Sequence, residues 1–194
     1  LNLALQNSDE TISKTIQVTD KETRFQMVSD TRPLKLRADP DIEIFRQLYP
    51  DEIPPAINAL KSSRALLVLL ADNLEPDMES ATRMLLRSLG IKNYTIAQEK
   101  TVDQKDLREK DILMVGYPQR KEVFLKLPQQ VAIKPHSFTL NQHTYNRPTD
   151  VFFGVFGHPH RKDRVAALFL PLSSSHAEAV ARKVTHYGKY SYLA

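Results

Sequence analysis

Four short, uninterrupted apolar runs constrain the fold of this chain more than any other feature. They are Ala65–Ala71 (ALLVLLA), Asp111–Gly116 (DILMVG), Val151–Phe156 (VFFGVF) and Val165–Leu170 (VAALFL). A short run without polar alternation is typical of a strand that is covered on both faces. The sequence therefore predicts a sheet with other elements packed against both of its sides.

A helix-type pattern follows the first run and points to an α/β arrangement. Met78, Ala81, Leu85 and Leu89 fall on one helical face, and Gly90 stands where a helix ends. Strand–helix–strand repetition is typical of parallel strands joined by right-handed crossovers. We therefore expect residues 64–194 to form an α/β accessory domain. Its sheet is expected to be mixed but mainly parallel and doubly wound by flanking helices, as in flavodoxin or Rossmann folds.

The first third of the chain has a different character. Residues 1–37 contain short alternating apolar and polar stretches, which predict an antiparallel β segment, the end of a β-sandwich. Residues 38–63 contain four prolines, which exclude a long helix or a central strand there. We expect this part to be an ordered linker, held to a neighbouring surface by Ile42, Phe45, Leu48 and Ile53.

Composition excludes several classes of function. The chain has no Cys, so it has no disulfide, no thiolate nucleophile and no Cys-ligated metal. Its 27 Lys and Arg are nearly balanced by 23 Asp and Glu, and nucleic acid is not an expected partner, although it stays as the weakest alternative. No apolar run approaches the ~20 residues of a transmembrane helix, so we expect no membrane span in this sequence.

The catalytic and cofactor motifs that could be recognised by spacing are missing. The sequence contains no G-x-G-x-x-G, no G-x-x-x-x-G-K-[ST], no G-x-S-x-G and no H-E-x-x-H. His158 and His160 could share a metal, but no third ligand is identifiable by spacing. We therefore assign no catalytic residue, no metal site and no cofactor.

A ligand site can still be located by position. In open α/β sheets, ligands bind beyond the carboxyl ends of the strands. Polar residues follow three of the apolar runs and are densest after the third, where they either solvate a turn or bind a small molecule or anion. The candidate ligand-binding residues are Asn73, Tyr117, His158, His160, Arg161 and Arg164.

Two further stretches carry a resemblance to a known family. They are Asp39–Pro55, which includes Asp39-Pro40-Asp41 and Glu52-Ile53-Pro54-Pro55, and His186–Leu193 (HYGKYSYL). Together they resemble the region downstream of the catalytic module in exported bacterial proteins related to zinc aminopeptidases of the aminopeptidase N type. The family's zinc ligands and general base lie in an H-E-x-x-H module that this sequence lacks, so no catalytic residue can be transferred.

The resemblance implies a non-catalytic, C-terminal accessory or interaction domain. Its partner would be the catalytic module of the same parent chain, in the cell envelope or periplasm. The alternative is a small-molecule or anion-binding α/β domain that uses the crevice near Tyr117 and His158.

Overall fold

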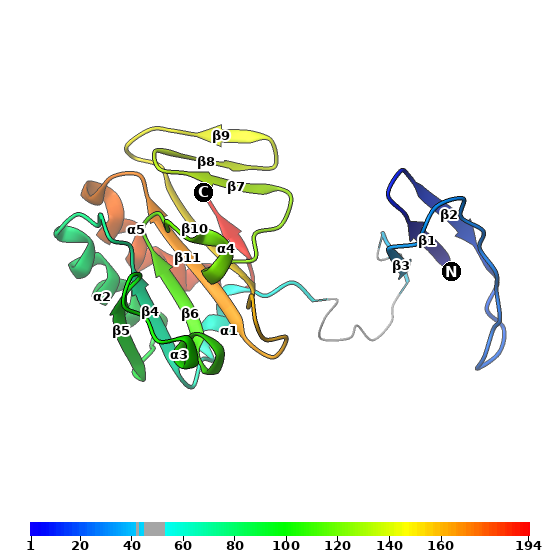
Figure 1. The fold of residues 1–194 in the computed structure, drawn as a ribbon, viewed down its shortest axis with the longest axis horizontal. Coiled ribbons are helices and arrows are strands. Elements are labelled where there is room, and N and C mark those ends of the chain that lie inside the picture. Colours follow the sequence, from blue (N-terminus) through cyan, green and yellow to red (C-terminus); the bar gives the residue numbers. More distant parts are fainter. Residues whose placement is uncertain (42, 45–52) are drawn as a thin grey trace. The chain divides into compact units, whose positions relative to one another are not determined.

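The computed structural model describes residues 1–41, 43–44 and 53–194 (Figure 1). The chain divides into two compact units, Leu1–Tyr49 and Pro50–Ala194. The linker expected at residues 38–63 falls partly outside the described residues, and so do the roles expected of Ile42, Phe45 and Leu48. Ile53 is described, and its side chain is exposed rather than buried.

The N-terminal unit is a three-stranded antiparallel sheet. Its strands are β1 (Asn2–Gln6), β2 (Thr11–Thr15) and β3 (Lys35–Ala38), in the order β2-β1-β3. Leu3, Ala4 and Leu5 of β1 are buried because β1 is the central strand. The alternation around Phe25 and Met27 does not form a strand, since an alternating pattern alone, without a partner strand, does not specify one.

A six-stranded sheet forms the centre of the C-terminal unit (Figure 1). It lies in the order β12-β10-β11-β6-β4-β5. These strands are β12 (Tyr192–Leu193), β10 (Val151–Gly157), β11 (Val165–Pro171), β6 (Asp111–Val115), β4 (Leu66–Leu70) and β5 (Tyr94–Gln98). Every residue of β4 and β6 is buried, which confirms that these apolar runs are strands covered on both faces.

Helices cover one face of this sheet. They are α1 (Ile57–Lys61), α2 (Asp77–Leu89) and α5 (Ala177–Lys183), the last flanked by the 3₁₀ turns η1 (Ser174–His176) and η2 (Val184–Tyr187). Met78 and Leu85 of α2 belong to the same buried cluster as Val68 of β4. Helix α2 ends where the sequence predicted, at Gly90, whose φ of 74° is a conformation that glycine adopts without strain.

The opposite face is covered partly by helices and partly by a second small sheet. The helices are α3 (Gln104–Glu109) and α4 (Lys121–Phe124), and the strands are β7 (Val131–Lys134), β8 (Ser137–Leu140) and β9 (His143–Tyr145). Leu107, Phe124 and Phe138 from these elements pack in one cluster with Leu67 and Leu69 of β4.

The expectation of a mainly parallel, doubly wound, flavodoxin- or Rossmann-like fold is wrong. In the part of the chain that the structure describes, six of the nine strand pairings are antiparallel. Parallel pairing joins β5, β4, β6 and β11, but after β6 no long crossover helix returns the chain along the sheet. Helix α4 has only four residues, and the chain continues through hairpins, which join antiparallel strands.

The turn between β8 and β9 shows how the hairpins arise. Asn141 and Gln142 both have positive φ, at 48° and 69°. This combination is typical of a two-residue turn that connects adjacent antiparallel strands. The sequence suggested the hairpin here, but the number of such hairpins after β6 is what makes the fold largely antiparallel.

Gly154 in the middle of β10 provides a test of the packing. An added Cβ at Gly154 would lie 2.7 Å from ring atoms of Phe152 and Phe156, and both rings are buried. We expect Gly154→Ala to lower the free energy of unfolding by about 1–3 kcal/mol, because the rings must leave their packed positions. Urea denaturation measures the change.

The matched control is Gly157→Ala at the end of the same strand, where an added Cβ meets no atom within 4 Å. This control should unfold at nearly the wild-type urea concentration. Equal stability of the two variants would contradict the packing described for β10.

Candidate functional site

A pocket of ≈ 370 Å³ lies at the carboxyl ends of three strands that run in the same direction. Ala71 follows β4, Gly116 follows β6, and Pro171 ends β11, and all three line it. The connections diverge at β4, since α2 and α3 pack against opposite faces of the sheet and lead to strands on opposite sides of β4. Such a divergence leaves a crevice between the two connecting loops.

Gly116 allows the two loops to approach each other closely. Its φ is 82°, and a Cβ at this position would lie 2.6 Å from Leu74 Cδ1 and 3.1 Å from the Ala71 side chain. Only glycine combines this backbone conformation with this close approach. The turn after Gly116 places Tyr117 in the wall of the pocket.

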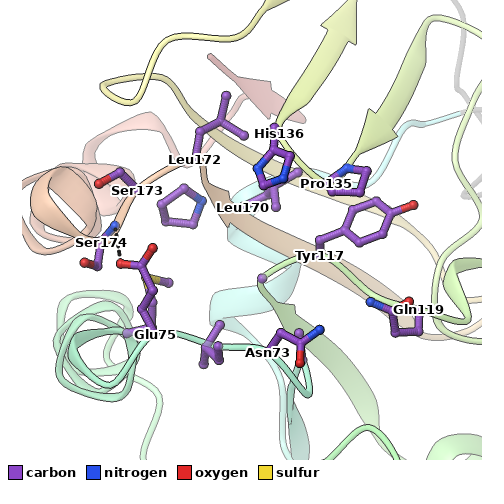
Figure 2. A pocket seen from close by; sticks show the side chains of 15 residues that line it. Asn73, Glu75, Tyr117, Gln119, Pro135, His136, Leu170, Leu172, Ser173 and Ser174 are labelled. Atoms are coloured by element: carbon purple, nitrogen blue, oxygen red, sulfur yellow. Dashed lines mark hydrogen bonds between the residues drawn. The ribbon is translucent and has the colours of Figure 1, made fainter.

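Polar side chains from four segments of the chain surround the pocket (Figure 2). The polar lining residues are Asn73, Glu75, Tyr117, Gln119, His136, Ser173 and Ser174. Glu75 Oε2 accepts a hydrogen bond of 3.3 Å from the backbone N–H of Ser174. Among the described residues, the side chains of Asn73, Tyr117 and Gln119 have no hydrogen-bond partner, so these groups are available to a ligand.

The charge of the lining restricts what can bind. Glu75 is the only carboxylate in the described lining, and no Lys or Arg side chain belongs to it. A site for a phosphate or carboxylate typically supplies Arg or Lys side chains or a row of backbone N–H groups. The lining therefore favours an uncharged ligand over an anion.

A buried carboxylate holds the loop that carries Tyr117 and Gln119. Glu99, only 1% exposed, follows β5 and accepts hydrogen bonds from the backbone N–H groups of Gln119 (3.1 Å) and Arg120 (2.8 Å). The Arg120 side chain returns a hydrogen bond of 2.7 Å to the Glu99 carbonyl oxygen. Sequence reasoning missed Glu99, because nothing in its local pattern separates it from the other acidic residues.

The structure divides the predicted ligand-binding residues into two groups. Asn73 and Tyr117 line the pocket, whereas His158, His160, Arg161 and Arg164 lie near the opposite end of the sheet. The strand pairing explains the separation. Gly157 at the end of β10 pairs with Val165 at the start of β11, because these strands are antiparallel, so the carboxyl end of β10 lies beside the amino ends of β11 and β6.

His158 occupies a buried position in this second group. It is 5% exposed, and its Nδ1 accepts a hydrogen bond of 3.1 Å from the backbone N–H of His160. Its Nε2 has no partner among the described residues. Burial lowers the pKa of His158 below the ordinary histidine value, nearby His160 and Arg164 lower it further, and Asp111 opposes them. The geometry favours the neutral imidazole, because protonated Nδ1 could not accept this bond.

The neighbouring predicted residues are occupied by local contacts. Arg161 makes an exposed ion pair with Asp163, with 2.9 Å between Nε and Oδ1, and the hydrogen bond from Arg161 lowers the pKa of Asp163 to about 2. His160 Nε2 lies 3.2 Å from the carbonyl oxygen of Val123. No group of three or more His, Asp or Glu in the described parts of the chain is placed to hold a metal ion.

Comparisons with known proteins add no family to this description. No family model matches the chain, and no curated protein matches it. In the described residues, no helix is both long enough and apolar enough to cross a membrane.

The buried imidazole predicts a pH-dependent stability. His158 has a lowered pKa when folded, so the unfolded chain binds a proton more readily than the folded chain between the lowered pKa and about 6.5. The contribution of His158 to the free energy of unfolding is thus complete above about pH 6.5 and is lost as the pH falls through the lowered pKa.

Urea denaturation of the wild-type protein and His158→Gln between pH 5 and pH 8 measures this dependence. We expect the stability of the wild-type protein to fall more steeply than that of the variant below about pH 6.5. Parallel pH profiles for the two proteins would show that His158 does not titrate as described.

Proposed function

We propose that the unit Pro50–Ala194 binds a small, uncharged, hydroxyl-rich molecule, such as a sugar, in the pocket beside Asn73 and Tyr117. The observation that carries this proposal is the lining itself: several polar side chains around one pocket, with no Lys or Arg among the described lining residues. The pocket volume of ≈ 370 Å³ lies near the lower end of the range for ligand sites, about 300–1,000 Å³, which favours a small ligand.

The side chains supply complementary kinds of contact. The amide groups of Asn73 and Gln119 each offer a donor and an acceptor, and the Ser173 hydroxyl can do either. The ring of Tyr117 offers a flat apolar surface, whose partly negative face attracts the C–H groups of a sugar ring. Glu99 supports this arrangement, because its carboxylate holds the backbone beneath Gln119.

A thermal-unfolding screen tests the proposal. The panel contains neutral monosaccharides and disaccharides, inorganic phosphate and divalent metal ions. A sugar at 100 times its Kd should stabilise the protein by about 2.7 kcal/mol, which appears as a rise in Tm. Tyr117→Ala should abolish the rise, because it removes the stacking surface.

The matched control is Tyr190→Ala, which removes an exposed tyrosine that does not line the pocket. The control should keep the sugar-dependent rise in Tm. Stabilisation by phosphate but not by any sugar, lost in Tyr117→Ala, would contradict an uncharged ligand. No stabilisation by any sugar in the panel would contradict the proposal as a whole.

We also propose a non-catalytic accessory role beside a catalytic module, as the family resemblance implies. The N-terminal unit favours this role, because large apolar side chains on it are exposed, including Val28 (73%) and Leu34 (65%). Exposed apolar groups of this kind are typical of surfaces that contact another protein. The two proposals are compatible, since a ligand site can lie on an accessory domain.

An aminopeptidase assay tests the non-catalytic role. The purified chain should not hydrolyse amino-acid arylamides, with or without added zinc, because its sequence has no H-E-x-x-H. An unrelated zinc aminopeptidase serves as the positive control. Hydrolysis by the clean protein that disappears after chelation would rule out an accessory role alone.

A further inference from the structure

A groove of ≈ 670 Å³ lies beside β7, and it is larger than the pocket described above. One wall is β7 itself, and the other is α4 with the residues that follow it. Apolar side chains line both walls, namely Leu125, Leu127, Val131 and Ile133. We refer to this feature as the β7 groove.

The groove runs along a strand whose second edge is unpaired. In the described parts of the chain β7 pairs only with β8, and Figure 1 shows α4 on the side of β7 away from β8. Gln130 and Lys134 face β8, since Gln130 accepts a hydrogen bond from Asn141 and Lys134 pairs with Ser137 beside the turn. Backbone groups alternate in direction along an antiparallel strand, so those of Ile133 point away from β8. They can bond to an added strand.

The charges at the groove are unbalanced. Lys121, Lys126 and Lys134 line it, against a single carboxylate, Glu122. Lys121 lies 3.8 Å from Glu122, whereas Lys126 and Lys134 make no ion pair with any described residue. Both of these lysines are exposed. The groove therefore complements a partner that carries negative charge.

We propose that the β7 groove binds an extended acidic peptide segment, which adds to the small sheet as a strand beside β7. The backbone of the peptide bonds to the free edge at Ile133, its apolar side chains lie against Leu125 and Leu127, and its carboxylates meet Lys126 and Lys134. Alternating acidic and apolar residues satisfy these contacts, because successive side chains of a strand point to opposite faces.

The shape of the groove favours a peptide over single-stranded nucleic acid. Tyr117 is the only aromatic residue among the described lining residues, whereas single-stranded nucleic acid is usually held on several stacked aromatic rings. A free strand edge matches a peptide backbone directly. This inference does not depend on the sugar-binding proposal, because Lys126 and Lys134 do not line that pocket.

Fluorescence anisotropy with labelled peptides tests the inference. The probe is a short acetylated peptide of alternating glutamate and valine. One comparison peptide replaces glutamate with lysine, and a second replaces the central valines with proline, which has no N–H to donate. The probe should bind at least about tenfold more tightly than either comparison peptide, and more weakly as salt rises.

Charge reversal then locates the site. The double variant Lys126→Glu/Lys134→Glu should weaken binding of the probe at least about tenfold, because it places repulsive charges at the groove. The control Lys105→Glu/Lys162→Glu reverses two exposed lysines elsewhere and should change the Kd by less than about twofold. Circular dichroism verifies that both variants are folded.

Three results would overturn the inference. The first is equal binding of the proline peptide, which would show attraction by charge alone. The second is wild-type affinity in Lys126→Glu/Lys134→Glu, which would place the peptide elsewhere. The third is tighter binding of a single-stranded oligonucleotide, lost in the same variant, which would identify a nucleic-acid site.

Discussion

The structure of the C-terminal unit depends on the burial of β4 and β6 on both faces. All their side chains are buried, so helices must cover one face and α3, α4 and the small sheet must cover the other. No polar group on these strands can reach a ligand from the middle of the sheet. Chemistry is therefore confined to the strand ends, where Asn73, Tyr117 and Gln119 gather around a pocket.

The sequence predicted the local elements better than the way they join. An apolar run specifies a buried strand by itself, and Ala65–Ala71 and Asp111–Gly116 contain β4 and β6. The direction of pairing depends on the connections, and these are weak in the sequence. A four-residue helix at Lys121–Phe124 and a turn at Asn141-Gln142 decide that the chain continues as antiparallel hairpins, so the expectation of a mainly parallel fold failed.

The same limit applies to the candidate site. Asn73 and Tyr117 could be predicted, because each follows a recognisable strand whose carboxyl end lies at one edge of the sheet. His136 and Ser174 could not, since they reach the pocket only through the hairpin of β7 and β8 and through the end of β11. His158 was expected beside Tyr117, and antiparallel pairing of β10 places it at the other end.

The central claim is that an uncharged ligand occupies the pocket at the carboxyl ends of β4, β6 and β11. The most direct measurement is a titration of the ¹⁵N-labelled protein with a neutral sugar, followed by amide chemical shifts. We predict that the shifts concentrate on Asn73, Gly116, Tyr117 and His136 and saturate with one Kd. Saturable shifts confined to residues outside this lining, or no shifts at all, would contradict the account.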